Sequence, residues 1–166
     1  MKKIIMVLML MAPMATFAQK FGHVDAQSIM QAMPEFIKAR GDLEAQSKEY
    51  ENDLKAMQDE LQRKSEAYDK TKSTMNATKQ QETETELQQM FAKIQQANQD
   101  YQQQLNKMQQ EKLAPIMNKV TTAIQNVGKN GGYVYIMDAS MGIPYISQTL
   151  SKDVTADVKA EIQKMK

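Results

Sequence analysis

Apolar residues recur along the middle of this chain with the spacing of a coiled coil. Phe36, Leu43, Tyr50 and Met57 lie seven residues apart. A second series, offset by four residues, contains Leu54, Leu61, Tyr68 and Met75. Interleaved, the two series give the alternating 4-3 spacing of a helix seam. Eight of its twelve positions are apolar, and the other four are Arg40, Ser47, Lys64 and Thr71. The pattern therefore predicts a long helix that packs against a second helix.

The apolar pattern resumes downstream and then changes character. The predicted second seam consists of Leu87, Phe91, Ile94, Asn98, Tyr101, Leu105 and Met108. Beyond it lies a broader aliphatic stripe, formed by Leu113, Ile116, Val120, Ile124 and Val127. A stripe of this width suits packing against a globular body better than packing in a two-helix seam.

The two seams are separated by the polar segment 72–81. The surrounding region is rich in Glu, Lys, Gln, Ala and Leu, which are strong helix formers. We expect an antiparallel coiled-coil hairpin over about residues 34–127, with its tip at about 76–82, the midpoint between Pro34 and Gly128. One unbroken helix in a parallel dimer is the alternative. Only the hairpin returns the aliphatic stripe to a body made from both chain ends.

Both ends of the chain contain short strand patterns. Segments 21–25, 133–137 and 144–147 read as strands, and glycines precede the second of them. Asp153 is expected to cap a last helix that begins at about Thr155. The apolar face of that helix would contain Val158, Ile162 and Met165.

The fold class that follows is mainly α with a small β body. A mature domain of residues 19–166 would combine a β body, from about 19–33 and 128–166, with the helical arm at 34–127. The helical hairpin brings the distant strand segments together, so that they can share one sheet.

The first residues resemble a secretory signal peptide. Lys2 and Lys3 precede the uncharged, mostly apolar run 4–14, and the segment 15–18 offers a small-residue cleavage site. The run is shorter than the roughly 20 apolar residues that a membrane span requires. We expect residues 1–18 to be a signal peptide that sends the mature chain across the inner membrane into the periplasm of a Gram-negative-type bacterium.

Composition excludes several functional classes. Removing Lys2 and Lys3 from the 21 basic residues leaves 19, against 20 acidic residues, so the mature net charge is −1. A chain with this balance has no electrostatic reason to bind nucleic acid, and membrane contact would be transient at most. With no Cys, it has neither disulfides nor thiolate chemistry, which suits an oxidising compartment.

Few residues suggest catalytic chemistry. His23 is the only histidine and lacks the partners of a metal motif, so we interpret it as a hydrogen-bonded structural residue. Asp25 and Asp138 each follow a predicted strand, and paired carboxylates can serve hydrolysis or divalent metals. Aspartates that cap the following turn are commoner. We expect no catalytic residues, no metal site and no cofactor.

The remaining candidate site is the surface of the distal arm. Residues 80–110 contain twelve glutamines, a hydrogen-bonding and nearly uncharged coat. The candidate binding residues are Tyr68, Met75, Met90 and Phe91. Methionine is flexible and is frequent on promiscuous binding surfaces. The alternative is that Tyr68, Met75 and Phe91 only close the seam; Met90, one position before the predicted seam residue Phe91, is expected to be exposed.

Several segments, in order, resemble the OmpH/Skp family of periplasmic chaperones. Residues 21–25 resemble the family's opening strand, and 113–116 its L-x-P-I segment. Residues 132–138 resemble its glycine-tyrosine strand, 144–146 its last strand, and 153–155 the D-[IV]-T motif that opens the final helix. The resemblance covers essentially the whole mature chain.

This resemblance implies a homotrimer whose strands form a central body, with three helical arms around a cavity. It also implies an ATP-independent holdase that binds unfolded outer-membrane β-barrel proteins and prevents their aggregation. The mature charge of about −1 departs from the strongly basic members of the family, so a lipopolysaccharide site is not expected. The alternative functions are a non-catalytic coiled-coil spacer of the cell envelope and an enzyme built on Asp25 and Asp138.

Overall fold

The computed structural model describes residues 19–165, so the predicted signal peptide at 1–18 lies outside the described residues. The chain divides into two compact units. One, here called the body unit, combines residues 19–26 with residues 122–165. The other, the arm unit, spans Gln27–Thr121. The predicted arm bounds, at about 34 and 127, lie seven residues after the first residue of this unit and six residues after its last.

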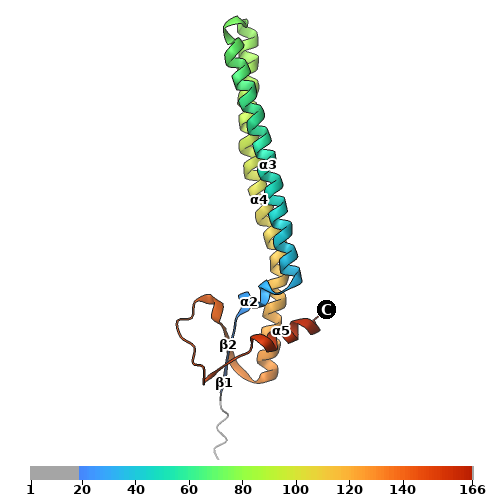
Figure 1. The fold of residues 1–166 in the computed structure, drawn as a ribbon, viewed down its shortest axis with the longest axis vertical. Coiled ribbons are helices and arrows are strands. Elements are labelled where there is room, and N and C mark those ends of the chain that lie inside the picture. The colour runs from blue at the N-terminus through green and yellow to red at the C-terminus, as the bar shows by residue number, and fades with distance from the viewer. Residues whose placement is uncertain (1–18, 166) are drawn as a thin grey trace, which may run out of the picture. The chain divides into compact units, whose positions relative to one another are not determined.

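Two long helices build the arm unit (Figure 1). After the short α2 (Ala26–Gln31), α3 (Pro34–Thr71) begins with proline in its first turn, where the missing N–H leaves no bond unmade. The 3₁₀ turn η2 (Lys72–Thr74) links α3 to α4 (Ala77–Gly131), which continues from the arm unit into the body unit.

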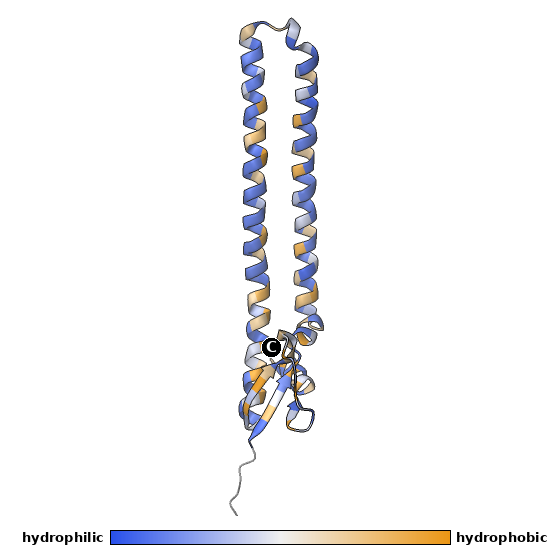
Figure 2. Cartoon of the chain, turned by 90° about the vertical axis from the view of Figure 1, so that its left-hand side faces the viewer, coloured by the Kyte–Doolittle hydropathy of each residue, from blue (hydrophilic) through white to orange (hydrophobic). Residues whose placement is uncertain are grey.

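Within the arm unit, α3 and α4 lie side by side, and both are mostly hydrophilic with apolar positions spaced along them (Figure 2). Side-chain contacts connect the helices along their length, and the partner's number on α4 falls as the number on α3 rises. These contacts pair Glu35 with Lys119, Asp42 with Lys112, Tyr50 with Tyr101, Lys64 with Glu86, and Tyr68 with Glu84.

The prediction for the tip was wrong by several residues. The chain turns through η2 and Asn76, and α4 already includes most of the predicted tip segment 76–82. Asn76 fixes this start, because its Oδ1 accepts a hydrogen bond from the Lys79 backbone N–H at 2.8 Å, as an N-cap does. The midpoint argument placed the tip too late because it assumed two helices of equal length, whereas α3 has 38 residues and α4 has 55.

The body unit contains a three-stranded parallel sheet in the order β2-β1-β3. The central strand β1 (Lys20–Val24) pairs with β2 (Tyr133–Asp138), so two strands far apart in sequence share a sheet, as predicted. The helix α5 (Thr155–Lys164) also begins where predicted. The side chains of the core that are completely shielded from solvent are Val24, Ala123, Val154 and Val158.

The prediction of a strand at 144–147 was wrong. This segment is a loop, and the third strand is β3 (Ser151–Asp153), which pairs with Phe21–His23 of β1. The sequence Ser-Lys-Asp has no apolar alternation, so its pattern gave no strand signal. Pro144 lacks the N–H that a ladder needs, and proline is confined to strand edges and bulges.

Candidate functional site

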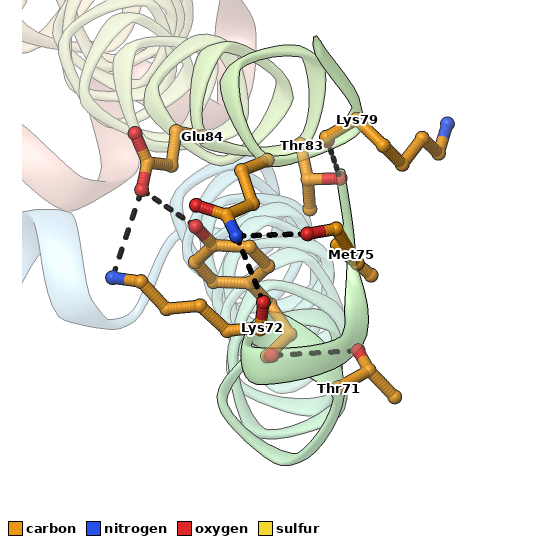
Figure 3. Close-up of polar contacts among 8 residues, drawn as sticks. Thr71, Lys72, Met75, Lys79, Thr83 and Glu84 are labelled. Atoms are coloured by element: carbon orange, nitrogen blue, oxygen red, sulfur yellow. Dashed lines mark hydrogen bonds and ion pairs between the residues drawn. The ribbon is translucent and has the colours of Figure 1, made fainter. Parts of the chain in front are cut away.

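The tip of the arm holds Tyr68, the first candidate residue, in a polar network. Tyr68 is 6% exposed, and its hydroxyl donates to Glu84 Oε1 at 2.5 Å. Lys72 Nζ lies 3.7 Å from the same carboxylate and 5.3 Å from the centre of the Tyr68 ring (Figure 3). The hydrogen bond to Glu84, followed by burial, raises the pKa of Tyr68 to about 12. Tyr68 therefore joins α3 to α4 at the tip, in agreement with the seam alternative.

Met75, the second candidate, lies in the turn itself. Its side chain is half-buried, and its carbonyl accepts a hydrogen bond from Gln80 Nε2 at 3.1 Å (Figure 3). The same amide donates to the carbonyl of Lys72 at 2.9 Å. These two bonds satisfy carbonyls of the turn that follows α3, so the turn is fixed while the methionine stays partly accessible.

The structure reverses the predicted positions of Met90 and Phe91. Phe91, predicted in the seam, is 54% exposed, whereas Met90, predicted to be exposed, is half-buried and faces α3. The inward residues of α4 in this stretch are Leu87, Met90, Ile94, Ala97 and Tyr101. The intervals in this set are 3, 4, 3 and 4 residues, whereas those in the predicted set are 4, 3, 4 and 3. Met90 therefore takes the place of Phe91 and Ala97 that of Asn98, so all five positions are apolar.

A similar shift of one position occurs near the start of α3. Ala39 is buried at 5% exposure, whereas Arg40, a predicted seam position, is exposed. Placing alanine inward leaves the guanidinium in water, where its charge is solvated.

A hollow of about 270 Å³ lies between α3 and α4 around Met90 and is here called the arm groove. Its lining residues are Met57, Glu60, Lys64, Glu86, Gln89, Met90, Lys93 and Ile94. Lys64 and Glu86 form an ion pair across it, and their hydrogen bond raises the pKa of the Lys64 ammonium and lowers that of the Glu86 carboxyl. The groove thus has an apolar floor and a charged rim of balanced sign.

A second hollow of about 390 Å³ lies near the start of α3 and is here called the base groove. It is lined by Met33, Glu35, Lys38, Ala39, Asp42, Lys112, Pro115, Ile116 and Lys119. Both of its carboxylates are paired across the helices, Asp42 with Lys112 at 2.6 Å and Glu35 with Lys119 at 3.1 Å. These pairs tie the two helices together at this end of the arm unit.

Asp138 of the body unit caps the turn that follows it, and Asp25 is held through its backbone. Asp138 Oδ1 accepts from the Ser140 backbone N–H at 2.9 Å, the Ser140 hydroxyl at 2.7 Å and the Ala26 N–H at 3.3 Å. The backbone N–H of Asp25 donates to Thr155 Oγ1 at 3.0 Å. His23 Nδ1 lies 2.9 Å from Ser151 Oγ, the partner expected of a structural histidine. Within residues 19–165, His, Asp and Glu side chains do not gather into a group of three able to hold a metal ion.

The apolar surface of the body unit was not identified as a site from the sequence. β2 lies at an edge of the sheet, and its Val134, Tyr135 and Met137 are 46–57% exposed. Phe21 stacks on Tyr135 with ring centres 4.8 Å apart. The adjoining loop exposes Tyr145 by 79%. An open strand edge with apolar side chains is typical of a surface that another chain covers.

A family model described as outer membrane protein (OmpH-like) matches residues 20–162. This chain belongs to the OmpH-like family. No match to a curated protein was found. Among solved structures, the OmpH-like chain is similar to a protein from Caulobacter crescentus CB15 that is named as a candidate outer membrane chaperone (OmpH-like). The two share 16% identity with a TM-score of 0.73, over 88% of this chain and 85% of the other, which shows a common fold.

The OmpH-like chain exposes apolar side chains in both of its units. The arm unit carries partly exposed methionines, an exposed phenylalanine and a charged groove, and the body unit carries an apolar sheet edge. No helix in the described range 19–165 has the length and apolar character needed to cross a membrane. The exposed apolar side chains and the groove can hold flexible apolar ligands through dispersion and hydrogen bonding.

Proposed function

We propose that this protein is an ATP-independent periplasmic holdase chaperone that binds unfolded outer-membrane β-barrel proteins and prevents their aggregation. Its family membership and its likeness to an OmpH-like fold support this function. The observation that carries the proposal is the low burial of the arm: of the 38 residues of α3, only Ala39 and Tyr68 are buried.

Low burial matters because it leaves the arm compliant and its apolar side chains accessible. Helix stability in proteins comes mostly from packing of an apolar face, so an arm with little packing bends and opens at low free energy. We propose that α3 and α4 form an antiparallel coiled coil, and that its apolar seam side chains contact a client when the two helices separate. Clients of varied sequence could then be held without a fixed pocket.

The proposed client contacts are Met75, Met90, Phe91 and Tyr68. Phe91 is the most exposed, whereas Met75 and Met90 are half-buried and available to a side chain that enters between the helices. Tyr68 is covered by Lys72 and Glu84 and would contact a client only after the tip opens. All four are non-catalytic contacts in this proposal, and no nucleotide, metal or nucleic acid takes part.

A homotrimer assembled through the body unit completes the proposal. The exposed apolar residues of β2 and its open strand edge support self-association. Three arms fixed at one end would surround a client, so that each weak contact benefits from a high effective concentration.

An aggregation assay on residues 19–166 tests the function. An outer-membrane β-barrel protein is diluted from urea with and without the chaperone, while light scattering on a sizing column reports the mass of each species. Soluble client held by a trimer without nucleotide is the expected result. A monomer or dimer that leaves the client to aggregate would favour the coiled-coil spacer of the envelope instead.

A further inference from the structure

We infer that the arm groove receives single aromatic side chains from extended segments of the client. This inference rests on the proposed holdase function and deepens it, because it names the feature of the client that is recognised and the residues that recognise it.

The floor of the groove suits one apolar side chain. Met57 and Met90 are half-buried and Ile94 is 9% exposed, so three flexible or branched side chains form the base. Methionine sulfur makes favourable contacts with aromatic rings and adapts to their shape. The volume of about 270 Å³ is just below the range of about 300–1,000 Å³ found for small-molecule pockets, so the groove fits one side chain.

The rim of the groove suits the backbone on either side of that side chain. Glu60 on α3 and Lys93 on α4 both line the groove, and among residues 19–165 neither side chain has a hydrogen-bond or ion-pair partner. The Glu60 carboxylate can accept from a backbone N–H of the client, and the Lys93 ammonium can donate to a backbone carbonyl. An extended chain has both groups unpaired, and they gain most from a charged partner.

The base groove does not offer this combination. Its carboxylates Glu35 and Asp42 are already bonded to Lys119 and Lys112, so recruiting them would break an ion pair. The arm groove keeps one acid and one base available in addition to its internal pair of Lys64 and Glu86.

Strands of outer-membrane barrels carry aromatic side chains of the kind that the arm groove would receive. Along such a strand, apolar and polar residues alternate, and aromatic residues gather in girdles near each membrane interface. When one aromatic side chain of an extended segment enters the groove, its two neighbours point to the opposite side, away from the arm. The groove therefore favours aromatic segments of unfolded barrels over uniformly charged ones.

Methyl NMR tests the inference directly. The mature chain carrying ¹³C-methyl methionine is mixed with a β-barrel client diluted from urea. We expect the methyl signals of Met57 and Met90 to shift or broaden, while that of Met117, a 56%-exposed residue of α4 outside the groove, stays unchanged. A client whose aromatic residues are replaced by alanine should leave all three signals in place.

Matched substitutions provide the second measurement. Met90→Gln should weaken client affinity roughly tenfold, the loss typical of one important contact, whereas Met117→Gln should not change it. The double substitution of Glu60→Gln with Lys93→Gln changes only exposed side chains, so it should weaken binding without unfolding the arm.

The outcomes separate this inference from the proposed function. A client held in solution with Met90 and Met117 perturbed equally, or with affinity unchanged in both the Met90 and the rim variants, would overturn the groove and leave the holdase intact. A wild-type chain that holds no client would overturn both.

Discussion

Tyr50 of α3 and Tyr101 of α4 stack face to face, with ring centres 4.1 Å apart and planes inclined by 2°. The Tyr50 hydroxyl donates to Gln104 Oε1 at 2.7 Å, and the Tyr101 hydroxyl lies 3.5 Å from Asp53 Oδ2. Each tyrosine therefore contacts the opposite helix twice, through its ring and through its oxygen. The pair therefore joins α3 and α4 through an apolar stack and through polar contacts on either side of it.

The stack predicts a measurable coupling between the two tyrosines. Tyr50→Ala and Tyr101→Ala should each destabilise the arm, and the double variant should lose less than the sum of the two. A double-mutant cycle from urea unfolding should give a coupling free energy of about 0.5–1.5 kcal/mol, the range for aromatic pairs. Strictly additive losses would show that the rings do not stabilise each other. Tyr50→Phe, which keeps the ring, serves as the control.

Removing the Asn76 cap should affect only the start of α4. Asn76→Ala removes the acceptor for the Lys79 N–H and should destabilise the start of α4 by about 1 kcal/mol. Asn76→Asp keeps an acceptor there and should retain most of the stability. Hydrogen exchange of the amides at 77–79 measures both, with faster exchange expected for alanine alone. Equal exchange in the two variants would contradict the capping role.

Tyr68 should titrate later than an ordinary tyrosine. Its pKa is raised from 10.0 to about 12, chiefly by the hydrogen bond to Glu84. Because the folded pKa exceeds the unfolded one, the stabilisation is complete below pH 10.0 and is lost as the pH rises towards 12. Tyrosinate absorbance should contain a component that titrates near pH 12 and disappears in Tyr68→Phe. A smaller delay should remain in that variant, because burial also raises the pKa of Tyr101.

The titration of Glu84→Gln distinguishes the two causes that raise the pKa of Tyr68, the hydrogen bond to the carboxylate and burial. Removing the charge while keeping an acceptor should lower the pKa of Tyr68 towards its ordinary value. A late component that stays in place in this variant would mean that burial, and not the carboxylate, sets the pKa.

Acid should loosen the ion pairs that join α3 and α4. The hydrogen bond from Lys112 lowers the pKa of Asp42 below 3.8, and that from Lys64 lowers the pKa of Glu86 below 4.5. A carboxyl with a depressed folded pKa stabilises the fold above its unfolded pKa, and this contribution is lost as the pH falls through the folded value. The urea midpoint should therefore stay level above about pH 5 and drop as the pH falls below 4.5 and then below 3.8.

Asp42→Asn is the matched control for the acid effect. This variant lacks one of the titrating groups, so its midpoint should be lower than that of the wild type at neutral pH and should fall less on acidification. An identical acid response in the variant and the wild type would contradict a contribution from the Asp42–Lys112 pair.

The helices and two of the strands could be predicted because periodic apolar residues and strong helix formers act locally. The sequence could not predict which residues of the second seam face α3. Met90 and Phe91 are adjacent apolar residues, and 3-4 and 4-3 spacings fit both, so only pairing with α3 decides which one is inward. Ser151–Asp153 was missed because its strand is defined by its partner β1 and not by its own composition.

The arm groove was equally inaccessible to sequence reasoning. Glu60 and Lys93 lie far apart in the chain and have no shared motif. They meet only because the turn at η2 sets which residues of α3 face which residues of α4, and the tip prediction was several residues off. An error of that size moves each cross-helix pairing by more than a helical turn.

Two glycine-to-alanine substitutions should have opposite effects. Gly132 connects α4 to β2 with φ of +67°, a conformation that strains a residue with a Cβ. Gly132→Ala should therefore destabilise the protein by about 1 kcal/mol. Gly41 lies inside α3 with open space around its Cα, so Gly41→Ala should stabilise the helix by up to about 1 kcal/mol. Thermal unfolding followed by circular dichroism should show midpoints that move in opposite directions; a gain in stability for Gly132→Ala would mean that the turn adopts a different backbone conformation in solution.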